Sequence, residues 1–329
     1  MEQRIKDRFS NDILMEAMQR FGIQKDQIKI LDSFESFIYE YSNALGSFVL
    51  RLSHSIRRNE FLIQAEVDWI NYLAEHGVSV SNAIFSQDGS LVEVIDDHQG
   101  GEFLVTAFVK ARGEPPWGRW TPALYESYGE LLGKMHALTQ QFKPILAERK
   151  RPEWDDPIFD FVGQFLPESE SLMHEKYRAI CKHVNKLPKN SNTYGLIHQD
   201  AHGGNLFIDE KGQISLFDFD DCCYSWFIND IAMVLFYIVM DAEDREAFTQ
   251  EFMLHFLQGY LRHCTLDFDL LNEIPYFLKM REIELYAVIQ RDFDLDNNWV
   301  NSFMKDRKYY IETDVPFINY DFSLLQTLL

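Results

Sequence analysis

Apolar and polar residues alternate with two different periods in the first 109 residues. Apolar side chains at helical spacing predict helices over residues 11–22 and 60–76, and each of these runs meets a glycine, a common helix end. Six short runs rich in β-branched and aromatic residues, separated by turn residues, predict strands. These runs cover residues 28–34, 36–42, 45–53, 83–86, 91–95 and 103–109. The pattern therefore predicts a small β-rich lobe that carries helices.

The remainder of the chain is mainly helical in pattern. Residues 110–120 contain two Gly and two Pro and are typical of a linker. Helical periodicity then predicts helices over 121–138, within 170–187, over 230–240 and through most of 241–329. Two short apolar runs, joined by Glu210-Lys211-Gly212, interrupt them as a predicted hairpin. The predicted fold class is α+β, with lobes at residues 1–109 and 110–329.

Composition narrows the class of protein. The apolar fraction of 46% over 329 residues excludes a disordered chain, and no apolar run approaches the ~20 residues of a membrane helix. The first 22 residues place charges where a signal peptide has its apolar core, so we expect no export. The four Cys form no CxxC pair, which favours reduced thiols and a cytoplasmic location.

The chain is strongly acidic. Its net charge of −21, from 31 Lys and Arg against 52 Asp and Glu, argues against nucleic acid or an anionic membrane as a partner. The charge is compatible with a cationic substrate. Acidic cytoplasmic proteins are common, however, and the composition favours the simpler interpretation that the charge keeps the protein soluble. The oligomeric state cannot be read from these features.

Candidate chemistry is concentrated in residues 196–221, "LIHQDAHGGNLFIDEKGQISLFDFDD". Half-buried carboxylates in such numbers are costly unless a cation lies among them. Asn205 begins the first strand of the predicted hairpin and Asp218 ends the second, so both side chains lie at the same end. Oxygen ligands of this kind suit Mg²⁺. Asp200, five residues before Asn205, is placed to reach past the metal toward a substrate.

An alternative interpretation uses the histidines of the same stretch. His198, Asp200 and His202 alternate, and on a strand they would share one face and could bind a transition metal for hydrolysis. Gly203-Gly204 favours a loop in place of a strand, which argues against this alternative.

The order H-x-D-x4-N, hairpin, D-F-D resembles the catalytic loop and metal-binding motif of the protein-kinase-like fold. The version "HQDAHGGN…LFDFDD…NDIA" is most similar to the aminoglycoside phosphotransferase and choline kinase group of small-molecule kinases. The resemblance implies that Asp200 is the catalytic base and that Asn205 and Asp218 hold Mg²⁺ on the nucleotide phosphates. It further implies that Asp220 reaches a second metal or the substrate.

The resemblance also assigns supporting residues. His198 would be structural, and Asp230 would brace the catalytic loop through hydrogen bonds. A kinase-like fold needs a basic residue on the third strand paired with a Glu on the next helix. Arg51 and Glu66 occupy these positions, and Glu66 lies in an apolar line that favours an ion pair with Arg51 over a carboxylate in water.

The nucleotide site carries two departures from the family pattern. Arg51 stands where Lys is more typical, and the turn at residues 31–37 has no Gly, so Ser33 or Ser36 would donate to the phosphates. The adenine would lie against the backbone of Phe108 to Lys110. These departures motivate the alternative of a catalytically weak nucleotide-binding or regulatory protein. The complete set of motif residues speaks against it.

The acceptor site would be built by the C-terminal region. Asp292, Asp294 and Asp296 with Trp299 could bind an amine, although such a run is also typical of a solvated helix cap. The predicted function is Mg²⁺-dependent transfer of the γ-phosphoryl group of ATP or GTP to a hydroxyl of a small molecule. A cationic molecule is one candidate for this acceptor. Alternatives are a homoserine- or choline-type kinase and a protein Ser/Thr kinase.

Overall fold

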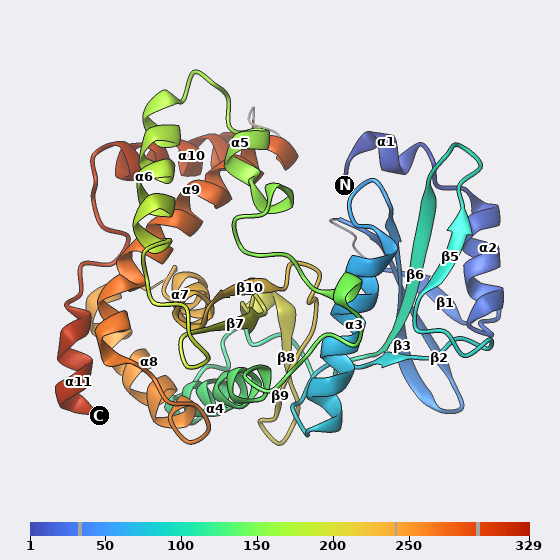
Figure 1. The fold of residues 1–329 in the computed structure, drawn as a ribbon, viewed down its shortest axis with the longest axis horizontal. Coiled ribbons are helices and arrows are strands. Elements are labelled where there is room, and N and C mark those ends of the chain that lie inside the picture. Colours follow the sequence, from blue (N-terminus) through green and yellow to red (C-terminus); the bar gives the residue numbers. More distant parts are fainter. Residues whose placement is uncertain (32–34, 241, 294–296) are drawn as a thin grey trace. The chain divides into compact units, whose positions relative to one another are not determined.

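The computed structural model describes residues 1–31, 35–240, 242–293 and 297–329, which form two compact units (Figure 1). The first unit consists of Met1–Glu114, Phe142–Arg151 and Phe207–Asp220. The second consists of Pro115–Gln141, Pro152–Leu206 and Asp221–Leu329. Both units draw on segments that are distant in sequence. The functional lobes at 1–109 and 110–329 stay a prediction.

An antiparallel sheet of six strands forms the centre of the first unit, in the order β1-β2-β3-β6-β4, with β5 also paired to β6. Its strands are β1 (Ile28–Ile30), β2 (Phe37–Asn43), β3 (Gly46–His54), β4 (Ala83–Ile84), β5 (Glu93–Asp96) and β6 (Glu102–Val109). All six predicted strand runs are therefore present, and three of them, β1, β4 and β5, are shorter than predicted. The helices of this unit are α1 (Gln3–Lys6), α2 (Asn11–Arg20) and α3 (Glu60–Glu75).

The two faces of this sheet are covered by different helices (Figure 1). Because successive side chains of a strand point to opposite faces, Leu50 and Leu52 of β3 share one face, where they join the core under α1 and α2. Arg51 must point to the other face. Ser10 caps α2 by accepting a hydrogen bond from the backbone N–H of Ile13 at 3.3 Å.

The predicted hairpin is also present. Strands β8 (Leu206–Ile208) and β9 (Ile214–Leu216) form a two-stranded sheet. The carboxylate of Asp209 accepts hydrogen bonds from the backbone N–H groups of Lys211 and Gln213, at 2.8 and 2.9 Å, which closes the turn. Gly212, with a φ of +82°, supplies the left-handed position that this turn requires.

The second unit is mainly helical. Its helices are α4 (Pro122–Thr139), α5 (Phe161–Phe165), α6 (Ser171–Val184), α7 (Phe227–Ile238), α8 (Arg245–Tyr260), α9 (Ile274–Asp292), α10 (Asn298–Glu312) and α11 (Leu325–Leu328). The sequence pattern missed the short antiparallel sheet of β7 (Tyr194–Ile197) and β10 (Cys223–Trp226). Within the described ranges, no helix has the length and hydropathy that a membrane span requires.

Helices α4 and α8 pack with their backbones in close contact. A Cβ atom on Gly129 would lie 1.8 Å from the carbonyl oxygen of Phe256, and one on Gly259 would lie 1.9 Å from that of Glu126. Both helices therefore need glycine at the crossing. Tyr128, next to Gly129, donates its hydroxyl to the carbonyl oxygen of Ala201 at 2.8 Å, so this packing supports the loop that carries Asp200.

Candidate active site

The loop that follows β7 is held by a buried carboxylate at the start of α7. The two oxygens of Asp230 accept hydrogen bonds from the backbone N–H groups of His198 and Gln199, at 2.9 and 2.8 Å. Gln199 has a φ of +73°, a conformation that a non-glycine residue keeps only where its surroundings enforce it. These are hydrogen bonds of the kind predicted for Asp230, and its role in a catalytic loop stays a prediction.

The imidazole of His136 completes this support. Its Nε2 lies 3.1 Å from Asp230 Oδ2 and its Nδ1 lies 2.9 Å from the hydroxyl oxygen of Tyr260. The ring is fully buried. His136 is therefore a core residue.

Asp200 lies in the loop with both carboxylate oxygens engaged. Oδ1 accepts a hydrogen bond from Arg281 at 2.7 Å, and Oδ2 accepts one from the amide nitrogen of Asn205 at 3.1 Å and lies 3.3 Å from Nε2 of His202. Burial acts to raise the pKa of Asp200, but Arg281, His202 and His198 outweigh it and hold the pKa well below its usual range. Asp200 is therefore a carboxylate at neutral pH.

Asn205 is oriented by the same loop. Its amide nitrogen also donates to the backbone carbonyl of Asp200 at 3.0 Å, so two hydrogen bonds assign Nδ2 to the interior of the loop. The amide oxygen is then the atom that is suited to a cation. Asn205 directly precedes β8, one residue before the strand that the sequence predicted it to begin.

Asp218 and Asp220 follow β9 in the first unit. Asp218 has a φ of +62°, so the chain holds this residue in a conformation that is unfavourable for Asp. Asp220 is buried, forms an ion pair with Arg57, and its Oδ1 has no hydrogen-bond partner among the described residues. A buried carboxylate oxygen without a donor fits a hard cation such as Mg²⁺, which prefers oxygen ligands.

The charge of Asp220 is set by a cluster of arginines. Burial acts to raise the pKa of Asp220, but Arg57, Arg58, Arg51 and Arg151 outweigh it and hold the pKa well below its usual range. Sequence reasoning missed Arg57 and Arg151 as members of this site. The only local signal was the Arg57-Arg58 pair shortly after a predicted strand.

The predicted ion pair between Arg51 and Glu66 is confirmed. The two terminal nitrogens of Arg51 donate to the two oxygens of Glu66, each at 2.8 Å. Both residues are buried, so the alternative of a Glu66 carboxylate in water is wrong. Burial acts to lower the pKa of Arg51, but the Glu66 carboxylate outweighs it and the pKa is raised. The Nε of Arg51 has no hydrogen-bond partner among the described residues.

Three of the remaining predicted nucleotide residues, Ser36, Phe108 and Lys110, have protein partners. The hydroxyl oxygens of Ser36 and Ser53 lie 2.9 Å apart in the interior, and Lys110 forms an ion pair with Glu40 at 2.7 Å. Phe108 lies in β6 with the guanidinium of Arg51 5.0 Å from its ring centre. Ser33 lies outside the described residues. The nucleotide-binding roles of these side chains stay predictions.

The alternative of a transition-metal site concerned the histidines of the loop that carries Asp200. Nδ1 of His202 accepts the backbone N–H of Gly204 at 2.9 Å, and Nδ1 of His198 accepts that of Asp200 at 3.3 Å, so both rings support the loop. Across the described ranges, no three His, Cys, Asp or Glu side chains are grouped to hold a metal ion.

In the acidic run, Asp292 pairs with Arg291 at 2.5 Å. Asp294, Asp296 and the side chain of Trp299 lie outside the described part of the structure, so an amine site there stays a prediction.

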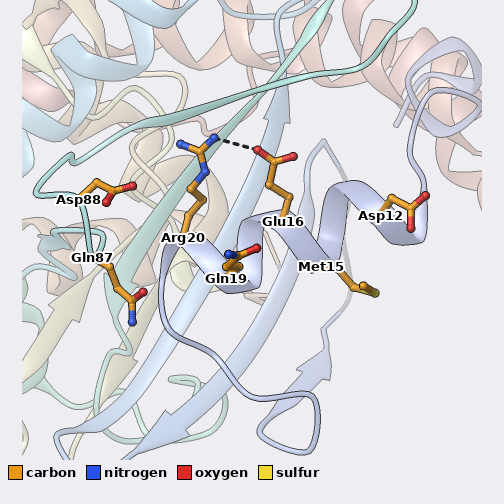
Figure 2. A pocket seen from close by; sticks show the side chains of 7 residues that line it. All are labelled: Asp12, Met15, Glu16, Gln19, Arg20, Gln87 and Asp88. Carbon is orange, nitrogen blue, oxygen red and sulfur yellow. Dashed lines mark hydrogen bonds and ion pairs between the residues drawn. The ribbon is translucent and has the colours of Figure 1, made fainter.

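A separate cavity of about 570 Å³ lies beside α2 in the first unit (Figure 2). It is lined by Asp12, Met15, Glu16, Gln19, Arg20, Gln87 and Asp88. Arg20 pairs with Glu16 at 2.8 Å and with Glu93 at 2.9 Å. None of the predicted site residues lines this cavity, and its arginine is already neutralised.

Comparisons with known proteins agree with this geometry. Residues 32–266 match the family described as "Phosphotransferase enzyme family". Amicoumacin kinase from Bacillus subtilis (strain 168) is 35% identical over 324 residues, which cover 95% of this chain and 95% of that protein.

Solved structures give the same result. The amicoumacin kinase hAmiN, in complex with AMP-PNP, Ca²⁺ and Ami, matches with a TM-score of 0.94 at 33% identity, over 99% of this chain and 100% of that chain. The microcompartment-associated aminopropanol kinase matches with a TM-score of 0.74 at 18% identity, over 93% of this chain and 98% of that chain, a likeness of fold alone. The predicted α+β, protein-kinase-like fold is confirmed.

Proposed function

This chain belongs to the phosphotransferase enzyme family, and we propose that it is a kinase that phosphorylates a hydroxyl group of an amicoumacin-type antibiotic. The family match and the solved amicoumacin kinase, which holds AMP-PNP and Ca²⁺, support transfer of a phosphoryl group from ATP to a small-molecule hydroxyl with a divalent metal ion. The identity with amicoumacin kinase, 35% over 95% of both chains, supports the choice of antibiotic. Choline-, homoserine- and protein-kinase alternatives have no comparable support.

The observation that carries the proposal is the state of Asp200. This side chain is ionised, is fixed by a braced loop and keeps 23% of its surface exposed, so a substrate hydroxyl can reach it. A carboxylate of low pKa is a weak base, but in a loose phosphoryl-transfer transition state it needs chiefly to orient the hydroxyl. The acceptor oxygen bonds to the γ-phosphorus, the bond from that phosphorus to the bridging oxygen of ATP breaks, and the hydroxyl proton passes to Asp200.

The metal is proposed to be Mg²⁺, held by the amide oxygen of Asn205 and the carboxylate of Asp218, with Asp220 as a further ligand. The donor chemistry supports this choice, since all three supply oxygen. A bound Mg²⁺ would neutralise charge on the nucleotide phosphates. Arg51, positioned by Glu66, is proposed to contact the same phosphates. We propose ATP over GTP, and a cytoplasmic location stays a prediction from the sequence.

The test is phosphorylation of amicoumacin by the purified protein with ATP and Mg²⁺, compared with an aminoglycoside, aminopropanol, choline and homoserine as acceptors. We expect amicoumacin to gain one phosphoryl group, detected by mass spectrometry, and no product with excess chelator. Asp200→Asn should lower kcat by about 10²- to 10⁴-fold with little change in nucleotide affinity, because it removes the base and keeps the shape.

Asp306→Asn, on the exposed side of α10 in the same unit, is the matched control and should retain wild-type turnover. Preferential phosphorylation of another acceptor would overturn the antibiotic assignment. Wild-type turnover by Asp200→Asn would overturn the catalytic assignment.

A further inference from the structure

The guanidinium of Arg281, on α9, lies directly against the proposed catalytic base. One terminal nitrogen donates to Oδ1 of Asp200 at 2.7 Å. The two residues are 81 positions apart in sequence and belong to the same compact unit. The side chain of Arg281 is only 14% exposed, so this contact lies largely out of water and is stronger than a surface ion pair.

Arg281 is itself held in place from two further sides. Its Nε and one terminal nitrogen donate to the hydroxyl oxygen of Tyr237, at 3.1 and 2.6 Å. Its other terminal nitrogen lies 4.0 Å from the carboxylate of Glu284, one turn along α9, and Glu284 accepts the hydroxyl of Tyr177 at 3.0 Å. An arginine with this many directed contacts has little rotational freedom left to lose when a substrate binds.

The two oxygens of Asp200 are not equivalent. Oδ2 faces two side-chain nitrogens, those of Asn205 and His202, whereas Oδ1 accepts a single hydrogen bond, from Arg281, within the part of the chain that the structure describes. A carboxylate oxygen has two lone pairs. The second lone pair of Oδ1 is therefore the position at which an acceptor hydroxyl can bind without displacing a protein donor.

We propose that Arg281 is a positioning residue for phosphoryl transfer, which turns the Asp200 carboxylate so that Oδ1 receives the acceptor hydroxyl. The inference rests on the proposed function and adds a residue that the motif does not contain. In this proposal Arg281 acts only through Asp200. Its loss should therefore lower kcat and leave nucleotide affinity unchanged, because a misdirected base costs rate and not nucleotide binding.

The test compares Arg281→Lys, Arg281→Ala and Tyr237→Phe with wild type, using amicoumacin as acceptor. Arg281→Ala should lower kcat by about 10- to 100-fold, the usual size of a lost charge-assisted hydrogen bond. Added guanidinium ion should restore part of the lost rate in Arg281→Ala. The kcat of Arg281→Lys should lie between those of wild type and Arg281→Ala. Tyr237→Phe keeps the ring that packs against His202 and removes only the hydroxyl, so we expect a smaller loss of kcat.

Arg262→Ala is the control for guanidinium addition. Arg262 is 51% exposed, pairs with Glu126 and Glu130, and contacts no residue of the proposed site. Its rate should be that of wild type and should not rise with guanidinium. AMP-PNP affinity, measured by calorimetry, should be equal in all variants, and thermal unfolding will identify any variant that fails to fold.

Slow ATP hydrolysis, with water as acceptor, gives a second readout that does not depend on the antibiotic. We expect the same order of rates among the variants. If the proteins hydrolyse ATP with rates in this order but the wild type does not phosphorylate amicoumacin, the antibiotic assignment is refuted and the role of Arg281 is upheld. Any of three results for Arg281→Ala would overturn the role of Arg281. These are a wild-type kcat, a loss of kcat that guanidinium does not rescue, and a parallel loss of AMP-PNP affinity.

Discussion

At the scale of single residues, Arg51 and Glu66 show why a buried charge needs its partner. Side-chain exposure is 6% for Arg51 and 0% for Glu66, so each ion has given up its water and depends on the other. Removal of one member of such a pair leaves an uncompensated charge in the interior. Replacement of both by apolar residues removes the charges together.

The stability of the first unit should reflect this dependence. Glu66→Leu should lower the free energy of unfolding by about 3–5 kcal/mol, whereas the double variant Arg51→Met/Glu66→Leu should lose much less. Urea unfolding of both variants measures the difference. Arg4→Met, which breaks an exposed pair with Glu2 in the same unit, should change the free energy by less than about 1 kcal/mol. A double variant as unstable as Glu66→Leu would contradict this account.

At the scale of elements, the crossing of α4 and α8 determines how close two helices can lie. Alanine is a better helix former than glycine by about 1 kcal/mol, so propensity alone predicts that Gly129→Ala stabilises α4. The contact of 1.8 Å between a Cβ at this position and the carbonyl oxygen of Phe256 predicts the opposite. Backbone cannot move aside as a side chain does, so the helices must separate.

We therefore expect Gly129→Ala to destabilise the protein by about 1–3 kcal/mol or more, as overpacked cores do. Turnover should fall with it, because the neighbouring Tyr128 supports the loop of Asp200. Thermal unfolding and kcat measure the two effects. Ser127→Ala, on the same helix, removes only a hydrogen bond to the carbonyl of Ala123 and should have little effect on either. An unchanged melting temperature in Gly129→Ala would show that the helices tolerate the added carbon.

At the scale of the whole molecule, buried carboxylates give stability opposing dependences on pH. Arg281 beside Asp200 and Arg57 beside Asp220 hold the pKa of these carboxyls below the usual range, so their contributions are present above about pH 4 and are lost as pH falls below it. Glu284 is the opposite case. Burial raises its pKa to about 7, with Asp221 and Asp200 adding to the effect and Arg281 and Tyr177 opposing it.

Between about pH 4 and 7, Glu284 is therefore protonated in the folded chain and ionised in the unfolded chain. Stability from this group is lost as pH rises through that range, and the penalty is fully present above pH 7. Glu284→Gln mimics the protonated form and should remove the penalty. Relative to wild type, the variant should gain roughly 2–4 kcal/mol between pH 4 and pH 8. Urea unfolding of both proteins at the two pH values checks this, and a constant difference would refute it.

Local patterns in the sequence determined much of the fold and part of the candidate site. The alternation along β3 placed Arg51 on the face opposite Leu50, and the spacing along α3 placed Glu66 on its buried side, so their pairing followed from two short periods. The order of Asp200, Asn205 and Asp218 around one hairpin was equally local. The apolar runs predicted the strands because successive side chains of a strand point to opposite faces whichever strand it pairs with.

Tertiary structure alone decided the contacts between distant parts of the chain. Arg57 reaches Asp220 across 163 positions, and Arg281 reaches Asp200 across 81. No periodicity identifies such partners, because a sequence pattern reports which face of an element is buried and not which other element covers it. The sheet of β7 and β10 was missed for this reason as well, since each short strand is stabilised by the other. The residues of the loop could be identified from the sequence, whereas the arginines that surround it are brought there by tertiary packing.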